Sequence, residues 1–261
     1  MKRTRIDCIP FHLPEAILPY LKGAALYDSS CSPEARVWFL DAKGGYYLKR
    51  HAVGALRKEA DMAAYFGRKG LGAEVLLYTS DGEADYLLTS RVAGEDCTDP
   101  RYLADPRRLA ILLGETLRAL HETDFSDCPV QDHTTAYLAL AAENHEKGLF
   151  DASFLSGYGI SAAEQAWAVH TAGKGRLRNE VLLHGDYCLP NVMLNDFRLS
   201  GFIDVGNGGV GDRHVDLFWG AWTLAFNLGS DAYRDLFFDA YGRDKIDFER
   251  LSTVAATETF G

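Results

Sequence analysis

The pattern of the sequence changes once, near Gly94, and this change limits the folds open to the chain. Before it, residues 34–50 and 74–92 each contain two β-rich runs around a turn. Residues 55–69, between these runs, have the apolar spacing of an amphipathic helix. Strands joined by short turns pair antiparallel. The part of the chain before Gly94 therefore predicts a mostly antiparallel sheet with one helix.

After Gly94, helical patterns predominate. They cover residues 105–124, 134–148, 161–175, 216–226 and 231–242. Asp105 is a candidate N-cap for the first of these helices, and Pro106 lies in its first turn. Residues 187–204 differ, because two short apolar runs flank Asn195–Asp196 and predict a hairpin.

We therefore predict an α+β fold with two lobes. Residues 1–93 would form a small N-terminal antiparallel β lobe with one helix, and residues 94–261 a larger, mostly helical C-terminal lobe. The hinge is expected at residues 90–95. Because ligands prefer concave sites between domains, we expect the binding site in a cleft between the lobes.

Composition limits the partners. The 261 residues are 47% hydrophobic and 25% charged, which is ordinary for a soluble globular protein. A net charge of −10 does not provide the basic face that nucleic acid needs. No apolar run approaches a membrane span, and the N-terminus lacks the apolar core of a signal peptide. We expect a monomer or weak dimer with neither nucleic acid nor membrane as partner.

The five cysteines are scattered, and none is in CxxC spacing. This pattern argues against a disulfide framework and against a structural zinc site, and it favours the reducing cytoplasm. Cys188 is more simply a small packing residue than a reactive thiol.

Two segments, HGDYCLPN at 184–191 and LSGFID at 199–204, place oxygen-bearing side chains next to apolar runs. Asp186 can accept a proton from a hydroxyl. Asn191 and Asp204 offer an amide oxygen and a carboxylate, which suit Mg²⁺, a hard cation that takes few protein ligands. A base, an amide and a carboxylate are the parts of a phosphoryl-transfer site of the protein-kinase kind.

Such a site also needs a strand lysine and a helix glutamate. Lys49 in YYLKR lies on a predicted strand, and Glu59 in KEADM lies on the helix that follows. Either residue alone is most often a solvated charge. Their occurrence in order with Asp186, Asn191 and Asp204 favours the functional interpretation. We predict that Lys49 pairs with Glu59 and contacts the α- and β-phosphates of a nucleotide.

The run GNGGVG, residues 206–211, offers an alternative, because it fits the glycine pattern of a dinucleotide-binding turn. A Rossmann site would place its acid at the end of a second strand, whereas Asp231 opens a helical run. Asp204 also stands just before the glycines, where it would repel an anion that lacks a metal. We give this alternative little weight.

The run from His184 to Leu217 resembles the core of the aminoglycoside 3′-phosphotransferases, relatives of the protein kinases. The resemblance rests on HGDxxxxN, SGFID and a DRxxD run, the last matched by Asp212, Arg213 and Asp216. It extends back through KEADM, YYLKR and the SSCSPEARV loop, and so covers most of the chain.

The resemblance implies a two-lobed protein-kinase-like fold with ATP or GTP as the phosphate donor. It also implies that Asn191 and Asp204 hold Mg²⁺ and that Asp186 is the catalytic base.

The same resemblance implies where the nucleotide binds. Tyr47 would stack on the adenine, and the backbone of Ser90 to Val92 would bind the edge of the base. Ser32 would lie in the loop over the phosphates.

The acceptor half of the family pattern is only partly present. Family members line this site with acids, but here Phe226 and Asn227 stand in the region of those acids, and Asn207 replaces an arginine. Glu258 and Phe260 remain near the C-terminus. We take Asn207, Glu258 and Phe260 as candidate substrate residues.

The prediction is an ATP-dependent O-phosphotransferase that transfers the γ-phosphate to a hydroxyl of a small molecule, of the kind that confers aminoglycoside resistance. One alternative is a kinase of the same fold for a less cationic hydroxyl compound, which Trp219, Trp222 and Phe226 would favour unless they pack in the core. A pseudokinase is a third possibility, and the intact set of five site residues argues against it.

Overall fold

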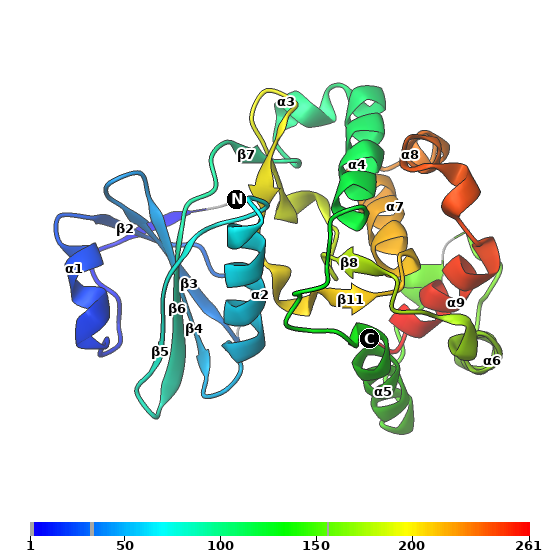
Figure 1. The fold of residues 1–261 in the computed structure, drawn as a ribbon, viewed down its shortest axis with the longest axis horizontal. Helices are drawn as coiled ribbons and strands as arrows, with labels where there is room; N and C mark the ends of the chain where they lie inside the picture. Colours follow the sequence, from blue (N-terminus) through cyan, green and yellow to red (C-terminus); the bar gives the residue numbers. More distant parts are fainter. Residues whose placement is uncertain (1–2, 32–33, 156) are drawn as a thin grey trace. The chain divides into compact units, whose positions relative to one another are not determined.

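The structure is a computed structural model that describes residues 3–31, 34–155 and 157–261 (Figure 1). Its contacts divide the chain into two compact units. The sheet unit comprises Met1–Asp96 and Pro190–Asn207, and the helical unit comprises Cys97–Leu189 and Gly208–Gly261. The segment Pro190–Asn207 therefore groups with the sheet unit, whereas the division based on sequence assigned it to the C-terminal lobe.

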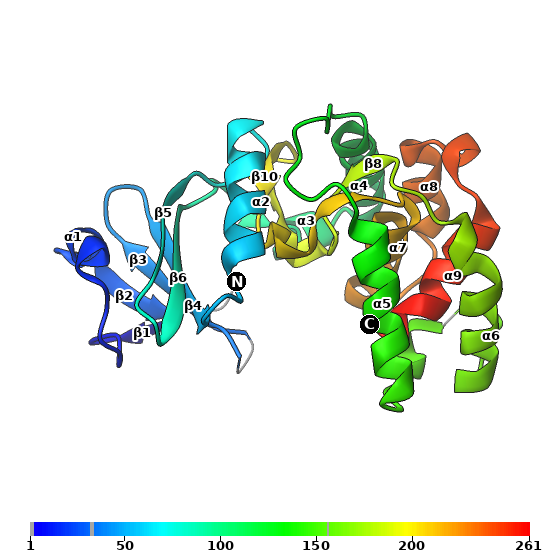
Figure 2. The ribbon, with the colours of Figure 1, turned by 60° about the horizontal axis from the view of Figure 1, so that its bottom comes forward.

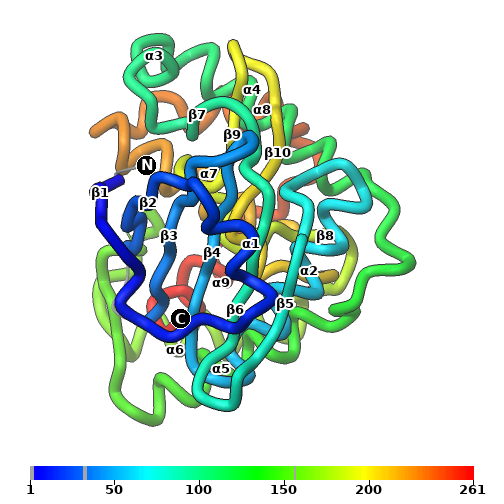
Figure 3. The backbone as a smooth tube through the Cα atoms, turned by 90° about the vertical axis from the view of Figure 1, so that its left-hand side faces the viewer, coloured from blue at the N-terminus to red at the C-terminus, as the bar shows by residue number. Residues whose placement is uncertain are grey.

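The sheet unit is built on a six-stranded sheet in the order β1-β2-β3-β4-β6-β5 (Figure 3), with antiparallel neighbours throughout. Its strands are β1 Thr4–Ile6, β2 Ala25–Asp28, β3 Arg36–Asp41, β4 Tyr46–Ala52, β5 Val75–Ser80 and β6 Ala84–Ser90. Both predicted hairpins are present, as β3–β4 and β5–β6. The predicted helix is α2, Arg57–Arg68, and the short α1, Leu18–Leu21, was not expected.

The two faces of this sheet differ because successive side chains of a strand point to opposite faces. Trp38 and Leu48 pair across β3 and β4, are fully buried, and pack in one cluster with Ile17 from the α1 side. Tyr47 and Lys49 flank Leu48 in β4 and therefore lie on the opposite face. Figure 1 shows α2 on that second face.

The segment Pro190–Asn207 and β7 together form a second, three-stranded sheet. It consists of β7 Glu95–Asp96, β9 Val192–Leu194 and β10 Leu199–Phe202, in the order β10-β9-β7. β9 and β10 confirm the predicted hairpin. The Phe202 N–H donates to the Leu71 carbonyl at 2.7 Å, and the Phe202 ring lies 6.1 Å from that of Phe66 in α2. These contacts dock the hairpin beside α2.

The helical unit contains seven α-helices and a small β-ladder among its described residues (Figure 2). They are α3 Pro100–Leu103, α4 Pro106–His121, α5 His133–Glu146, α6 Ala163–Gly173, α7 His214–Leu228, α8 Arg234–Tyr241 and α9 Phe248–Glu258, with β8 Val181–Leu183 and β11 Gly209–Gly211. Asp105 caps α4 as predicted, because its side chain accepts the Arg108 N–H at 3.2 Å. In the parts of the chain described, no helix is both long and apolar enough to cross a bilayer.

Glycines let α8 approach its neighbours closely. A Cβ on Gly114 of α4 would lie 2.4 Å from the Phe237 carbonyl oxygen, and a Cβ on Gly220 of α7 would lie 2.5 Å from the Phe237 ring. Both distances are too short for real atoms. α4, α7 and α8 can therefore pack together only because these two positions carry no side chain.

Candidate active site

Lys49 is the centre of a polar cluster in the sheet unit. Its Nζ lies 2.8 Å from Oε2 of Glu59 and 3.1 Å from Oδ1 of Asp204. Burial disfavours the charged ammonium, but the Asp204 and Glu59 carboxylates outweigh it and raise the pKa of Lys49. The predicted ion pair with Glu59 is therefore present. The second acid, Asp204, completes what we call the Lys49 cluster.

An apolar cavity of about 260 Å³ lies against this cluster. Side chains of β3, β6, α2 and β10 line it, and Lys49 stands on its wall. Tyr47, Ser90 and Val92 line the same cavity, whereas the predicted Ser32 lies outside the described residues. An apolar slot with a cation on its wall can hold a flat aromatic group that carries an anion.

The two predicted metal ligands lie at the ends of the hairpin β9–β10. The Ile203 N–H donates to the Asn191 carbonyl at 3.0 Å, which places residue 191 beside the chain that leads to Asp204. Asp204 itself has a left-handed backbone, with φ 57°. A Cβ on Gly206 would lie 3.1 Å from that of Glu59, so this glycine lets the Asp204 turn approach α2 closely.

In the helical unit, a buried carboxylate holds the loop that carries Asp186. The backbone N–H groups of His184 and Gly185 both donate to Asp216 of α7, each at 2.8 Å. Nε2 of His121 lies 3.1 Å from the same carboxylate. Burial opposes the charge of Asp216, but hydrogen bonding and the nearby histidine hold its pKa below its usual range. The Asp186 loop is thus attached to a fixed anion.

The neighbours of Asp186 in the chain brace it and do not react. The buried His184 ring accepts the Asp186 N–H at Nδ1, 3.3 Å away, and so braces the turn that carries this acid. Burial, and then the negative charge of Asp186, raise the pKa of the Cys188 thiol far above its usual range. Because the thiolate is the nucleophilic form, Cys188 is a poor candidate for a covalent phospho-enzyme.

The three candidate substrate residues lie in different surroundings. Oε1 of Glu258, at the end of α9, accepts the Tyr137 hydroxyl at 3.0 Å and the Trp219 Nε1–H at 3.2 Å. Burial raises the pKa of Glu258 to about 8, so this acid holds a proton at neutral pH. Phe260 is 2% exposed and packs in an aromatic cluster of the same unit. Asn207 is exposed and belongs to the sheet unit.

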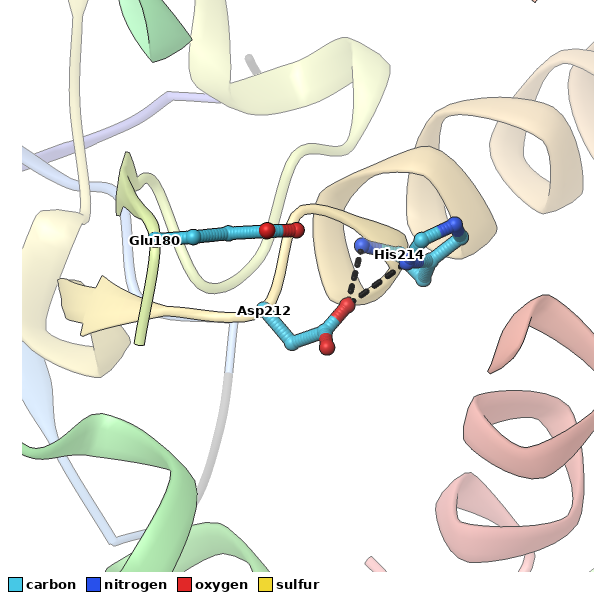
Figure 4. Close-up of side chains that lie close together, drawn as sticks. All are labelled: Glu180, Asp212 and His214. Carbon is cyan, nitrogen blue, oxygen red and sulfur yellow. Dashed lines mark hydrogen bonds and ion pairs between the residues drawn. The ribbon is translucent and has the colours of Figure 1, made fainter. Parts of the chain in front are cut away.

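Among the described residues, Glu180, Asp212 and His214 lie close enough together to resemble a metal site (Figure 4). Nδ1 of His214 is 2.6 Å from Oδ1 of Asp212, and Nε of Arg213 is 2.9 Å from Oε1 of Glu180. Arg250 of α9 forms ion pairs with both acids. Because two arginines already neutralise the acids, this network is structural and joins the β8–β11 ladder to α7 and α9.

Known proteins resemble the chain over most of its length. Residues 29–253 match the sequence profile of the phosphotransferase enzyme family. A probable aminoglycoside 3′-phosphotransferase of Lactococcus lactis subsp. lactis is 49% identical over 261 residues, 100% of this chain and 99% of the relative. An aminoglycoside 3′-phosphotransferase of Niallia circulans is 31% identical over 206 residues, 78% of each chain.

Solved structures resemble the fold as well. A crystal structure of an aminoglycoside 3′-phosphotransferase of type VIII has a TM-score of 0.72 at 24% identity, over 95% of this chain and 98% of that one. A Streptomyces rimosus aminoglycoside phosphotransferase, in complex with ADP and streptomycin, has a TM-score of 0.71 at 24% identity, over 86% and 90% of the two chains.

The fold, with its strand lysine paired to a helix glutamate, is that of the protein-kinase-like phosphotransferases. Within this class, the chain belongs to the phosphotransferase enzyme family, and its relatives at 49% and 31% identity are aminoglycoside 3′-phosphotransferases. It is an enzyme that transfers phosphate to an alcohol group.

Proposed function

We propose that this enzyme transfers the γ-phosphate of ATP to a hydroxyl of an aminoglycoside. The observation that carries the proposal is the Lys49 cluster on the wall of an apolar cavity. The relative that is 49% identical over the whole chain favours the aminoglycoside as acceptor. In this proposal the sheet unit binds the nucleotide, and the helical unit carries the base and the acceptor site.

The nucleotide would bind in the cavity of the sheet unit. Tyr47 would stack on the base, and Lys49 would hold the α- and β-phosphates. The Ser90 N–H already donates to the Glu74 carbonyl at 2.9 Å. Backbone contact with the edge of the base would therefore come from the Ser90 carbonyl and the Val92 N–H.

The residues at the ends of the β9–β10 hairpin fit Mg²⁺. Asn191 and Asp204 supply an amide oxygen and a carboxylate, which are the hard donors that this ion prefers, and few protein ligands suffice because phosphate and water complete its shell. When bound, the ion would neutralise charge on the transferring phosphate. Lys49, 3.1 Å from Asp204, would keep that carboxylate oriented toward the phosphates.

Asp186 would act as the base. Its carboxylate would orient the acceptor hydroxyl and take its proton late in the transfer, because a loose transition state leaves positioning as the main source of catalysis. The backbone hydrogen bonds from His184 and Gly185 to Asp216 support this role, because they fix the loop on a buried anion. Transfer would be direct, since the Cys188 thiol is held protonated.

The test measures turnover of ATP, and then of GTP, in the presence of Mg²⁺ and a panel of aminoglycosides. Release of nucleoside diphosphate reports the turnover, and the mass of the product shows whether the aminoglycoside has gained a phosphate. We expect acceptor-dependent phosphorylation that falls by roughly 10²–10⁴-fold in Asp186→Asn, which keeps the shape of the side chain. This variant should still bind the nucleotide. Slow hydrolysis that no aminoglycoside accelerates would contradict the proposed acceptor and leave a kinase for another alcohol.

A further inference from the structure

Arg3, at the edge of the sheet, contacts the tyrosine that we expect to stack on the nucleotide base. It directly precedes β1, the edge strand of the six-stranded sheet (Figure 3). Its Nη2 donates to the Tyr47 hydroxyl at 2.6 Å. Its guanidinium lies 3.8 Å from the centroid of the Phe39 ring and 5.7 Å from that of Tyr47. The N-terminal segment thus brings a cation to a wall of the nucleotide cavity.

The Arg3 guanidinium rests on a row of aromatic rings that crosses the sheet. In the strand register, Phe39 lies opposite both Tyr27 of β2 and Tyr47 of β4, so the three rings share one face. The centroids of Phe39 and Tyr47 are 5.2 Å apart. Phe39 is only 3% exposed, and a Cβ on Gly45 would lie 2.7 Å from its ring. Arg3 therefore stacks on a ring that close packing already holds in place.

Tyr47 separates Arg3 from the nucleotide cavity. A smaller cavity of about 130 Å³ adjoins the larger one, and Tyr47, Val92 and Ile203 line both. Arg3 lines only the smaller cavity. All the lining residues belong to the sheet unit. The tyrosine ring is thus a shared wall, in contact with Arg3 on the side of the smaller cavity.

A tyrosine at the mouth of a cavity can turn about two side-chain bonds unless its neighbours hold it. Fixing such a side chain when a ligand binds costs free energy, and fixing it beforehand lowers that cost. The hydrogen bond from Arg3 is charge-assisted and holds the hydroxyl end of Tyr47, while Phe39 packs beside the ring. Together these contacts set the plane on which a flat base can stack.

We infer that Arg3 is a positioning residue for the nucleotide, because it holds Tyr47 in the orientation that stacks on the base. This inference rests on the proposed function, since it takes Tyr47 as the residue that contacts the base. It gives the edge of the sheet a part in nucleotide affinity. Arg3 acts here through the tyrosine hydroxyl, so its effect depends on that hydroxyl being present.

The test is a double-mutant cycle of Arg3→Ala and Tyr47→Phe, read as the KM for ATP and as the Kd for ADP with Mg²⁺ by calorimetry. We expect Arg3→Ala to raise both constants about fivefold, which corresponds to about 1 kcal/mol. The kcat and the KM for the aminoglycoside should change by less than about twofold. In the Tyr47→Phe background, Arg3→Ala should raise the nucleotide constants by less than about twofold, because the hydroxyl is already gone.

Arg5→Ala is the matched control. Arg5 lies two residues further along the same edge, is exposed, and is absent from the described lining of both cavities. Its removal should leave the nucleotide constants unchanged. An equal loss in Arg5→Ala would overturn the inference, because any charge at this edge would then suffice.

A loss of the same size in the parent and in the Tyr47→Phe background would also overturn it, because Arg3 would then act without the hydroxyl. Unchanged nucleotide constants in Arg3→Ala would do so as well. If no aminoglycoside is phosphorylated, the acceptor half of the proposed function fails, and the ADP titrations still decide the role of Arg3. If the parent protein does not bind ADP, the nucleotide half of the proposed function fails and this inference fails with it.

Discussion

Lys49 faces two carboxylates, and its removal would leave both without their cation. We expect Lys49→Ala to lower kcat/KM for ATP by about 100-fold or more, because the phosphates lose their charged contact and Glu59 loses its partner. Steady-state kinetics with varied ATP measures this. Lys147→Ala is the control, since Lys147 pairs with Glu143 on an exposed helix surface. Normal transfer by Lys49→Ala would remove the assignment of Lys49 to the nucleotide.

Glu258 makes stability depend on pH. Its pKa is about 8 when folded, against 4.5 for an ordinary glutamate, so between these values the folded state holds one more proton than the unfolded state. Stability therefore falls as pH rises through this window, by at most about 1.4 kcal/mol per pH unit for this group.

Glu258→Gln should remove this slope, because the amide keeps an oxygen for the Tyr137 hydroxyl and has no charge to bury. Urea unfolding of both proteins at several pH values between about 5 and about 8 measures the difference. We expect the variant to gain stability relative to the parent as pH rises. Parallel pH profiles would show that Glu258 does not titrate in this range.

Gly94 directly precedes β7 and allows this strand to pair with β9. Its φ is +89°, and a Cβ there would lie 2.0 Å from the Leu194 carbonyl oxygen. Gly82, in the β5–β6 turn, has a φ of +88° and open space around it. A side chain at either position would carry the conformational cost of a positive φ. Only at Gly94 would it also clash with a neighbouring atom.

We expect Gly82→Ala to lower the free energy of unfolding by about 1 kcal/mol and Gly94→Ala to lower it by clearly more, about 3 kcal/mol or above. Chemical denaturation of both variants beside the parent tests this. Equal losses would mean that the backbone conformation alone matters and that β7 can move away from the hairpin.

The elements that could be predicted are those with strong local signals. The β3–β4 and β5–β6 turns contain Gly44–Gly45 and Asp81–Gly82, and α4 has both a cap and a clear apolar stripe. α9 was missed, because LSTVAATE is rich in β-branched residues and the helix depends on burial in the helical unit. β1 has three residues and exists only through its pairing with β2.

Across the whole molecule, site residues could be predicted where they belong to a sequence motif. They could not be predicted where a contact joins distant parts of the chain. Lys49 and Glu59 were recognisable because their order along the chain is itself the signal. The contact of His121 with Asp216 joins residues 95 positions apart, and no local pattern indicates it. The aromatic residues of α7 had only a partial signal, since the sequence pattern of Trp222 and Phe226 fits core packing as well as a ligand site.

The return of Pro190–Asn207 to the sheet unit affects how such a gene can be recombined. The chain crosses between the two units three times, after Asp96, after Leu189 and after Asn207. A chimera made by a single crossover near Asp96 would therefore join one parent's β4 and α2 to the other parent's β9–β10 hairpin. The residues of the Lys49 cluster would then come from two different parents. Lineages that exchange acceptor specificity by recombination should carry the codons for residues 190–207 along with those for the first unit.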